Sequence, residues 1–539
     1  MSDYKATLNL PQTDFPMKAN LAQREPDRLK AWEAMDLYGQ IRQASKDKPT
    51  FILHDGPPYA NGQLHVGHAI NKILKDIIIK SKTLSGFNAP YVPGWDCHGL
   101  PIELNVEKKV GKPGHKVSPA ESRQHCRDYA RKQVEAQKTD FMRMGVLGDW
   151  QNPYLTMDSA FEANVVRALA NIVEQGHLQR GFKPVHWCLD CGSALAEAEV
   201  EYRDKQSSAV DVLFPFVDVE EAGKRLDCAA DHASGVVIWT TTPWTIPSNK
   251  AVVYGSGISY GLYEVTSTPE ECWLNAGDTY LLADNLAADV FSRARLEEGM
   301  YLRKSDVTNE QLEKISLKHP LFEAEGGNGE WDDIRDFRAA DFVTDTEGTG
   351  FVHCAPSHGM EEFELYRDLG MLEQVITYNI MDDGRFRADL PFFGGKAILK
   401  PNGKEGNANA AIIDKLVEAG GLLARGKIKH SYPHSWRSKA PIIYRNTPQW
   451  FAAVDRAVGD GQDTHGMTIR ERALTSIDEL VKWTPQTGRN RLYSMIEARP
   501  DWVLSRQRAW GVPLTVFTRK GLLPTAPDFL LRKDEVNTR

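Results

Sequence analysis

Two histidines stand three positions apart at the beginning of an apolar helical pattern. His65 and His68 flank Gly67 in the stretch GQLHVGHAINKILKDIIIK, which covers residues 62–80. Unpaired backbone N–H groups and the helix dipole make a helix N-terminus a site for anions. A phosphate placed there would meet backbone donors and both imidazoles, and Gly67 would let it approach closely. The spacing alone also fits, and by itself favours, two histidines that simply cap the helix or fill space.

A strand, a loop and a helix must position these histidines. The apolar run TFILH, residues 50–54, predicts a buried strand, and the turn-rich DGPPYANGQ, residues 55–63, predicts a loop. The helix that follows carries an apolar stripe at i, i+3, i+4, i+7 and i+8, which predicts a buried face. That stripe consists of Ile70, Ile73, Leu74, Ile77 and Ile78. This order of elements is typical of the opening of a doubly wound α/β domain.

The residue pattern of the rest of the chain changes twice. From about residue 185 to about residue 430, β-branched, turn-punctuated segments predict a mostly β insert. Beyond it, segments of the α/β type return. A chain of 539 residues suggests about three domains. Its net charge of −8 excludes a globally basic nucleic-acid binder, although it allows a local basic face.

Cysteine content and hydropathy bear on the compartment. The seven cysteines are sparse and odd in number, and the first residues form no apolar signal. These features predict a reduced, cytoplasmic protein. The sequence has no run of about 18 apolar residues, so we expect no membrane span.

Three longer strings are far more specific than the histidine pair. They are HDGPPYANGQLHVGHAINKILKD (54–76), GWDCHGLPIE (94–103) and DWVLSRQRAWGVP (501–513). With them the chain resembles the class I aminoacyl-tRNA synthetases, and HVGH (65–68) is similar to their HIGH motif. The segment GPPYANG favours the isoleucine-specific members over the valine- and leucine-specific ones. The resemblance extends over essentially the whole chain.

The resemblance implies a Rossmann-like, doubly wound α/β catalytic domain that is interrupted by a mostly β editing insert. Its parts would be a helical arm at 1–48, the first catalytic half at 49–185, the insert at 186–430 and the second catalytic half at 431–539. We find no stretch like the family's KMSKS motif, and neither the later catalytic segments nor the anticodon-binding domain. We therefore expect an N-terminal fragment that does not charge tRNA by itself.

The resemblance also implies the chemistry of the first site. Members of the family activate an amino acid with ATP and transfer it to tRNA, here isoleucine and tRNA(Ile), and Mg²⁺ accompanies the ATP. In-line attack of the carboxylate on the α-phosphorus depends on positioning and charge stabilisation. His65, Gly67 and His68 would stabilise the phosphates, Pro57 would pack near the amino-acid side chain, and Asp96 would bind its ammonium. The alternative interpretation of Asp96, from its residue type alone, is a surface turn residue. We expect a monomer.

Two further stretches are similar to the family's editing domain, WTTTPWTIPSN (239–249) and GTGFVHCAPSHG (348–359). A pocket that excludes only larger side chains discriminates poorly against one methylene fewer, and isoleucine against valine is the standard case. The resemblance therefore implies a second site that hydrolyses valyl-tRNA(Ile). Its residues would be Thr240, Thr241, Thr242, Asn249 and His353. Without its flanking residues, the threonine run would simply indicate a strand.

One position departs from the family pattern. The family places an aspartate nine residues after the editing histidine to bind the substrate ammonium, and here that position is Glu362. The extra methylene moves the carboxylate by about 1 Å, and a displacement of that order can cost about a hundredfold in rate. We expect editing to be weakened or reshaped.

The stretch CLDC places Cys188 and Cys191 at zinc-ligand spacing. Relatives often complete such a site with a second cysteine pair, where this chain has Ser435 and Ser438. Serine is a poor zinc ligand, so a knuckle without metal is the favoured interpretation. The alternatives left open are a redox role and substitution by a nearby histidine, either His430 or His434.

Other functions compete with the synthetase interpretation. They are a stand-alone deacylase of mischarged tRNA and a non-catalytic tRNA-binding paralogue, which the full motif set of the first half disfavours. A redox or zinc-ribbon module built on CLDC explains only four residues. Lysines along the predicted helix are interpreted as a solvated face rather than as tRNA contacts: Lys72, Lys75, Lys80 and Lys82.

Overall fold

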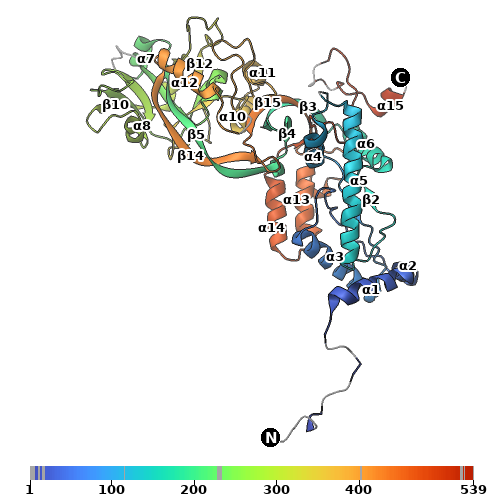
Figure 1. Cartoon of the computed structure of the whole chain (residues 1–539). Helices are drawn as coiled ribbons and strands as arrows, with labels where there is room; N and C mark the ends of the chain where they lie inside the picture. The colour runs from blue at the N-terminus through green and yellow to red at the C-terminus, as the bar shows by residue number, and fades with distance from the viewer. Residues whose placement is uncertain are drawn as a thin grey trace. The chain divides into compact units, whose positions relative to one another are not determined.

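The chain folds into two compact units, each with its own core (Figure 1). The computed structural model describes residues 7–9, 13–14, 18–114, 116–226, 234–400, 403–522, 526 and 528–537. Unit 1 comprises Met1–Asn171 and Arg508–Thr515, and unit 2 comprises Ile172–Gln507 and Val516–Arg539. The architecture is mixed α/β with a β-rich insert, as the sequence predicts. The functional boundaries expected at 185/186 and 430/431 stay a prediction.

Unit 1 is mostly helical. Its helices are α1 (Leu21–Ala34), α2 (Leu37–Ala44), α3 (Val66–Leu84), α4 (Leu100–Val110), α5 (Pro119–Arg143) and α6 (Ser159–Glu174), whose last turn crosses into unit 2. Helix α5 shows why such segments form. Ser118 and Glu121 make a reciprocal capping box at its start, and its buried face repeats at Cys126, Ala130 and Val134.

The strands of unit 1 are short and parallel. Strand β1 (Gly94–Trp95) pairs in parallel with β2 (Tyr154–Leu155), and on its other side the chain makes parallel bridges from Thr50 to Asn88 and from Tyr59 to Asp96. The segment 50–54 therefore joins the sheet through one bridge and forms no regular strand, which corrects the sequence-based expectation. Trp95, Phe141 and Trp150 fill the core beneath this sheet.

Helix α3 turns its apolar stripe outward, and the prediction of a buried stripe is wrong. The exposed fractions are 55% for Ile70, 40% for Ile73, 56% for Leu74, 55% for Ile77 and 44% for Ile78. The buried positions of this helix are instead Lys72, Asp76 and Ile79. The polar side chains on the inner face find ionic partners inside the unit, and this anchoring fixes the rotation of the helix.

A charged cluster provides that anchoring. The Lys72 ammonium contacts the Asp55 carboxylate and donates to Tyr91 Oη at 2.6 Å, and Tyr91 Oη donates to Asp55 at 2.7 Å. Lys75 pairs with the other Asp55 oxygen, and Lys80 pairs with Asp76. Burial alone would raise the pKa of Asp55, but its bonds to Lys72, Lys75 and Tyr91 hold it below the ordinary value. Lys72 is therefore a buried anchor, and Lys75 and Lys80 are partly exposed but paired with buried carboxylates, which corrects the expectation of a solvated lysine face.

Within the described residues, unit 2 contains three sheets. The six-stranded sheet has the order β10-β8-β9-β6-β5-β14, one four-stranded sheet has the order β11-β12-β7-β13, and the other has the order β16-β15-β3-β4. The strands are β3 (Leu178–Cys188), β4 (Ser193–Leu195), β5 (Val200–Pro215), β6 (Ser234–Thr240), β7 (Ala251–Tyr254), β8 (Tyr260–Val265), β9 (Thr279–Ala283), β10 (Tyr301–Val307), β11 (Ser316–Leu317), β12 (Arg335–Ala339), β13 (Phe351–Cys354), β14 (Leu422–Ser435), β15 (Ile443–Ala452) and β16 (Trp502–Val503).

Unit 2 also contains helices, most of them short. They are α7 (Val219–Arg225), α8 (Ala287–Arg293), α9 (Asn309–Leu312), α10 (Met360–Asp368), α11 (Leu372–Val375), α12 (Ala408–Glu418), α13 (Ile469–Glu479), α14 (Thr487–Glu497) and α15 (Lys533–Asn537). Side chains of the first two sheets share one core, to which Val212, Ile238, Val252 and Phe351 contribute. Among the described helices of the chain, none is both long and apolar enough to cross a membrane.

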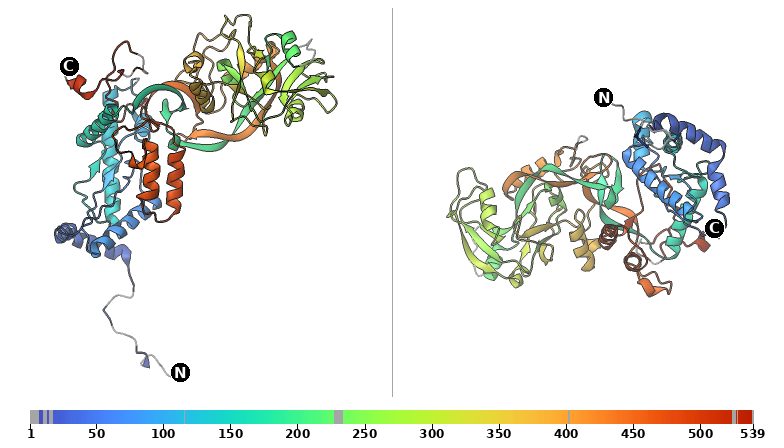
Figure 2. Two further views of the ribbon diagram at one scale, coloured as in Figure 1. Left: turned by 180° about the vertical axis from the view of Figure 1, so that it is seen from behind. Right: turned by 90° about the horizontal axis from the view of Figure 1, so that it is seen from below.

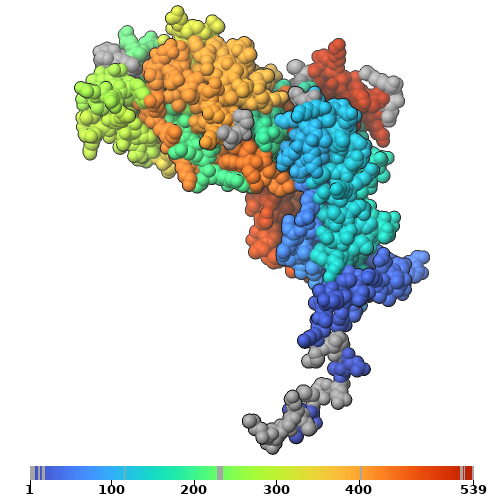
Figure 3. Space-filling view, in the orientation of Figure 1, coloured from blue at the N-terminus to red at the C-terminus, as the bar shows by residue number. Residues whose placement is uncertain are grey.

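A long antiparallel ribbon runs through unit 2. Strands β5 and β14 pair from Leu422 opposite Val212 to Ser435 opposite Val200, although more than 200 residues separate them in sequence. The green and orange segments follow each other in both ribbon views and adjoin in the space-filling view (Figures 1, 2 and 3). The ribbon joins the β-rich part of the unit to the sheet of β3 and β15.

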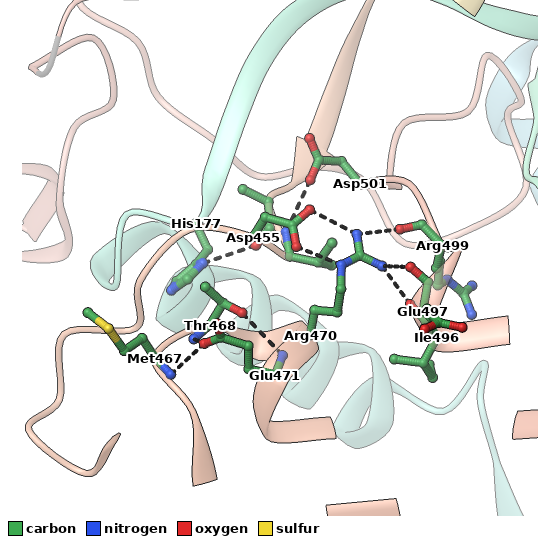
Figure 4. Close-up of polar contacts among 12 residues, drawn as sticks. His177, Asp455, Met467, Thr468, Arg470, Glu471, Ile496, Glu497, Arg499 and Asp501 are labelled. Carbon is green, nitrogen blue, oxygen red and sulfur yellow. Dashed lines mark hydrogen bonds and ion pairs between the residues drawn. The ribbon is translucent and has the colours of Figure 1, made fainter. Parts of the chain in front are cut away.

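Helices α13 and α14 are tied to β15 by one arginine (Figure 4). The Arg470 guanidinium binds both oxygens of Asp455 at 2.6 and 2.8 Å and donates to the carbonyls of Ile496, Glu497 and Arg499. It thereby satisfies the carbonyl end of α14 while holding the start of α13. Bidentate pairing of this kind fixes orientation as well as distance.

Candidate functional site

The two histidines cap α3. His65 is the N-cap residue, and its Nδ1 accepts the Gly67 N–H at 3.1 Å, while His68 Nδ1 accepts the His65 N–H at 3.3 Å. The ring centroids lie 3.9 Å apart. A Cβ at Gly67 would lie 3.0 Å from the His65 ring, so a larger residue here would require the ring to shift.

The capping bonds decide what the rings can offer a ligand. Because Nδ1 of each ring accepts a backbone N–H, the neutral ring carries its proton on Nε2, which is then a donor. Burial, together with the nearby His65 and Lys72, lowers the pKa of His68. The start of α3 is therefore a surface with two imidazole N–H donors beside the positive end of the helix dipole. The expected capping role and a phosphate-binding role are compatible in this geometry.

Pro57 and Asp96 lie on neighbouring parallel segments. The Asp96 N–H donates to the Pro58 carbonyl at 2.9 Å, and the Ala60 N–H donates to the Asp96 carbonyl at 2.8 Å. Pro57 lines a cavity of about 540 Å³ together with Ile52, Val92, Tyr154 and Phe161, whereas Asp96 is not among its lining residues. The cavity lies at the sheet of unit 1, next to Asp55, and its lining is mostly apolar.

A segment from the far end of the sequence completes this region. It belongs to the family motif at 501–513, within which no site residue was predicted. Trp510 is buried, and its indole N–H donates to the Cys97 carbonyl at 2.8 Å, directly after Asp96. Its ring packs edge-on against His98 with centroids 4.9 Å apart. Arg508 binds the buried Glu103 at 2.9 Å and anchors the segment to α4. The sequence signal that could have identified Trp510 was a tryptophan inside the long family-specific string 501–513.

In unit 2, four of the six predicted editing residues join one hydrogen-bonded network. Thr240 Oγ1 and Thr242 Oγ1 lie 3.2 Å apart, and the Thr242 N–H donates to Thr240 Oγ1 at 3.1 Å. Thr245, which the sequence reasoning missed, connects this pair to the histidine. Its Oγ1 lies 3.4 Å from Thr242 Oγ1 and 2.8 Å from His353 Nε2. Thr241 lies between the two partners and is half-buried.

Asn249 fixes the tautomer of His353. Its amide nitrogen donates to the Ala251 carbonyl at 2.8 Å, which can only accept, and the same nitrogen lies 3.4 Å from His353 Nδ1. Nδ1 is therefore the acceptor, and Nε2 donates to Thr245 Oγ1. The Thr245 hydroxyl in turn donates to the Thr242 carbonyl at 2.8 Å. Burial, with His358 nearby, lowers the pKa of His353 to about 4, so the imidazole is neutral at neutral pH.

Backbone geometry places His353 at this point. Strand β13 begins directly after Gly350, whose φ is +81°, and a Cβ there would collide with Ala283. Glycine is thus required by both the left-handed backbone and the close approach of β9. The register of β13 on β7 then puts His353 opposite Val252, three residues after Asn249.

Glu362 lies on α10, outside this network. It stands in the first turn of the helix, and its carboxylate occupies the space that a Cβ of Gly359 would take. Burial, with the neighbouring Glu361 also contributing, raises the pKa of Glu362 to about 7, against a bond from its own backbone N–H. Its charge acts on the buried Cys354, whose pKa burial also raises. The extra methylene leaves the carboxylate folded against the helix start.

The CLDC knuckle brings together the two cysteines and the two serines. Cys188 and Cys191 are paired as a disulfide, and Ser438 Oγ lies 3.6 and 3.7 Å from their sulfur atoms. Ser435 Oγ lies 3.8 Å from Cys191 Sγ. The nearby histidines are engaged elsewhere, His430 with Ser207 and His434 with the Tyr432 carbonyl. Among the described residues no cluster of metal-ligating side chains occurs, and two hydroxyls beside two sulfurs do not fit tetrahedral zinc.

Comparison with known proteins decides the family. The sequence model of "tRNA synthetases class I (I, L, M and V)" matches residues 27–523, most of the chain. The chain belongs to this family. An isoleucine–tRNA ligase of Ruegeria pomeroyi is 66% identical over 540 residues and is matched by 100% of this chain. An isoleucine–tRNA ligase of Alcanivorax borkumensis is 52% identical over 524 residues and is matched by 96% of this chain.

The class I synthetase chain spans about half the length of the curated relatives it matches, namely 54% of the Ruegeria protein and 51% of the Alcanivorax protein. A solved ternary complex of Agrobacterium radiobacter K84 agnB2 LeuRS with tRNA and LeuAMS aligns with 95% of this chain and 51% of that chain. It is 14% identical with a TM-score of 0.34, and such a likeness adds nothing to the assignment.

Proposed function

We propose that this chain carries the amino-acid activation and editing sites of an isoleucine–tRNA ligase, acting on isoleucine, ATP and tRNA(Ile). The observation that carries the proposal is the 66% identity, over the whole chain, to a protein of that name. The capped start of α3 and the threonine–histidine network support it, since each provides the polar groups that one of the two reactions needs.

In the activation step, the isoleucine carboxylate attacks the α-phosphorus of ATP and pyrophosphate leaves. His65 and His68 donate Nε2–H bonds to phosphate oxygens as charge develops, next to the N–H groups of the first turn of α3. Mg²⁺ bound to the ATP would supply further neutralisation of the phosphate charge. Asp96 pairs with the isoleucine ammonium, and Pro57 contacts the side chain in the cavity at the sheet. Trp510, packed beside Cys97 and His98, holds this wall in place.

In the editing step, water attacks the ester carbonyl of valyl-tRNA(Ile), and valine and free tRNA leave. The neutral His353 directs its Nε2–H to Thr245, and Thr245 aligns the Thr242 backbone and hydroxyl. Thr240, Thr241 and Thr242 then position the ester and the water. His353 thus acts as an orienting donor at neutral pH, since burial keeps it uncharged. Glu362 serves the substrate ammonium only if its carboxylate leaves the pocket beside Gly359.

The activation proposal is tested by isoleucine-dependent exchange of pyrophosphate into ATP. The assay uses this chain and this chain joined to the unmatched part of the Ruegeria relative. Replacing His65 and His68 together by alanine should reduce exchange by about a hundredfold or more, because two donors to the developing charge are lost. Arg24→Ala, on the exposed start of α1, is the control for the substitution itself. Exchange that survives the double replacement unchanged would exclude the proposed role of the histidines.

A second candidate function is favoured by one observation. The whole threonine–histidine network lies within unit 2 and is closed by hydrogen bonds of that unit alone. The chain by itself would then act as a deacylase of mischarged tRNA. Valyl-tRNA(Ile) hydrolysis by the unmodified chain and by Glu362→Asp, with isoleucyl-tRNA(Ile) as the control substrate, separates the two candidates. Valine-selective hydrolysis without pyrophosphate exchange would favour the deacylase.

A further inference from the structure

Arg293 holds together two segments that lead to the threonine–histidine network of unit 2. It is the last residue of α8, and its guanidinium binds both carboxylate oxygens of Asp211, at 2.6 and 2.9 Å. The same guanidinium donates to the Gly348 carbonyl at 3.0 Å. A planar guanidinium offers donors in more than one direction, so a single side chain can fix two acceptors at once.

Asp211 borders the strand that ends in the threonine run. It lies on β5, and the register of the sheet places it opposite Trp239 of β6, directly before Thr240. Its side chain is 2% exposed, and Arg293 is the cation with which it pairs. Burial raises the pKa of Asp211, whereas the bonds to Arg293 act against that rise. The carboxylate therefore depends on Arg293, because a buried anion without a partner is costly.

Gly348 begins the turn that leads to His353. Its φ is +87°, the φ of Gly350 is +81°, and β13 follows directly. A Cβ on Gly348 would lie 3.6 Å from the Trp239 ring. The turn and the end of β6 therefore pack against each other at the place where the guanidinium bonds to both segments.

We propose that Arg293 is a positioning residue for the editing reaction, and that it sets the placement of the threonine run relative to the strand that carries His353. The inference rests on the proposed editing function. Thr240 ends β6 and His353 lies in β13, so the hydrogen bonds that link them through Thr245 depend on how the two strands are placed. Because a displacement of about 1 Å can cost about a hundredfold in rate, loss of the Arg293 bonds slows hydrolysis without weakening the binding of tRNA.

Kinetics of valyl-tRNA(Ile) hydrolysis test the proposal in this chain and in this chain joined to the unmatched part of the Ruegeria relative. Arg293→Met removes the bonds to both segments and should lower kcat about tenfold or more, with KM changed less than about twofold. Arg293→Lys keeps a cation for Asp211 but loses the planar fork, so its kcat should fall between the two. The lysine variant also keeps the test open if the methionine variant does not fold.

Arg303→Met is the matched control for the substitution. Arg303 is 36% exposed against 33% for Arg293, and it binds both oxygens of Asp284, at 2.8 and 2.9 Å, within the same unit. Its loss removes an equivalent ion pair from another strand, β10, and should change kcat less than about twofold.

A spectroscopic readout that needs no turnover accompanies the kinetics. His353 is neutral and carries its proton on Nε2, so labelling the histidines with ¹⁵N gives this ring the signals of one tautomer, assigned with His353→Gln. We expect these signals to shift or split in Arg293→Met and to stay in place in Arg303→Met. A purely stabilising role of Arg293 would lower the thermal unfolding midpoint and leave the signals unchanged.

Two results would overturn the proposal. One is a kcat of Arg293→Met within twofold of that of Arg303→Met, measured well below both thermal unfolding midpoints. The other is an unchanged His353 signal in Arg293→Met. Absence of hydrolysis in both the unmodified chain and the joined chain would instead contradict the proposed editing function, and the His353 signal would still decide whether Arg293 positions the strand.

Discussion

The start of α3 and the threonine–histidine network place histidines in similar roles with opposite surroundings. At α3, His65 and His68 bond to the backbone of their own helix and stay at the surface. In unit 2, His353 is buried, and its partners Asn249 and Thr245 come from a different segment of the chain. The first site is open on the side where its helix is apolar, whereas the second is closed by its own unit.

The two sites therefore differ in whether they form from residues close in sequence or from distant segments. A capping box needs only residues three positions apart, so the start of α3 forms without help from distant segments. The threonine–histidine network forms only when β13, the turn after Thr242 and Asn249 lie together, and the shared core of two sheets holds them there. The start of α3 is therefore fixed by local hydrogen bonds, whereas the network in unit 2 depends on the packing of that unit.

The largest effect that tests this comparison is expected at the ionic anchor of α3. Lys72→Met should lower the free energy of unfolding by about 3 kcal/mol or more, because it leaves the buried Asp55 carboxylate with fewer partners. Equilibrium urea denaturation measures the change. Lys30→Met, in an exposed ion pair on α1, is the control and should change little. A small effect at Lys72 would mean that apolar contacts, and not charges, set the rotation of α3.

In unit 2 the corresponding test is Thr245→Val. Valine keeps the shape but removes the hydroxyl that receives the His353 N–H, so a buried donor loses its partner. We expect a loss of about 1–3 kcal/mol in unfolding free energy and slower valyl-tRNA(Ile) hydrolysis. Thr266→Val, whose hydroxyl donates to the Gly299 carbonyl at the surface, is the matched control in the same unit. Equal effects of the two substitutions would show that the hydrogen bond between Thr245 and His353 has no special importance.

The fold class and the β insert could be predicted because motif strings and segments rich in β-branched residues can be recognised from neighbouring residues alone. It also selected Thr240, Thr242, Asn249 and His353, which meet in space. It missed Thr245 because nothing local distinguishes that hydroxyl from its neighbours until β13 approaches. The prediction of a buried stripe on α3 was wrong because helical periodicity identifies an apolar face without saying which polypeptide covers it.

A pH-dependent effect is expected from Glu362. Since burial raises its folded pKa to about 7 from an ordinary value of 4.5, the folded state prefers the protonated form. The stability that this group provides is fully present below about pH 4.5 and is lost as the pH rises through about 7. Glu362→Gln should therefore be less sensitive to pH over this window than the unmodified chain. Unfolding free energies at several pH values measure this, with Glu373→Gln, exposed on α11, as the control.

The smallest expected effect is the most direct test of the contrast between the two regions. Ile77→Gln should change the unfolding free energy of this chain by less than about 0.5 kcal/mol, because the side chain is already in water and glutamine is a good helix former. Ile79→Gln, two residues later on the buried face, should cost about 2 kcal/mol or more. If both substitutions destabilise the free chain equally, the stripe is covered within the chain itself. If only Ile79 matters, the apolar face of α3 contributes little to the stability of this fold, and the ionic anchor and the buried face of the helix hold it in place.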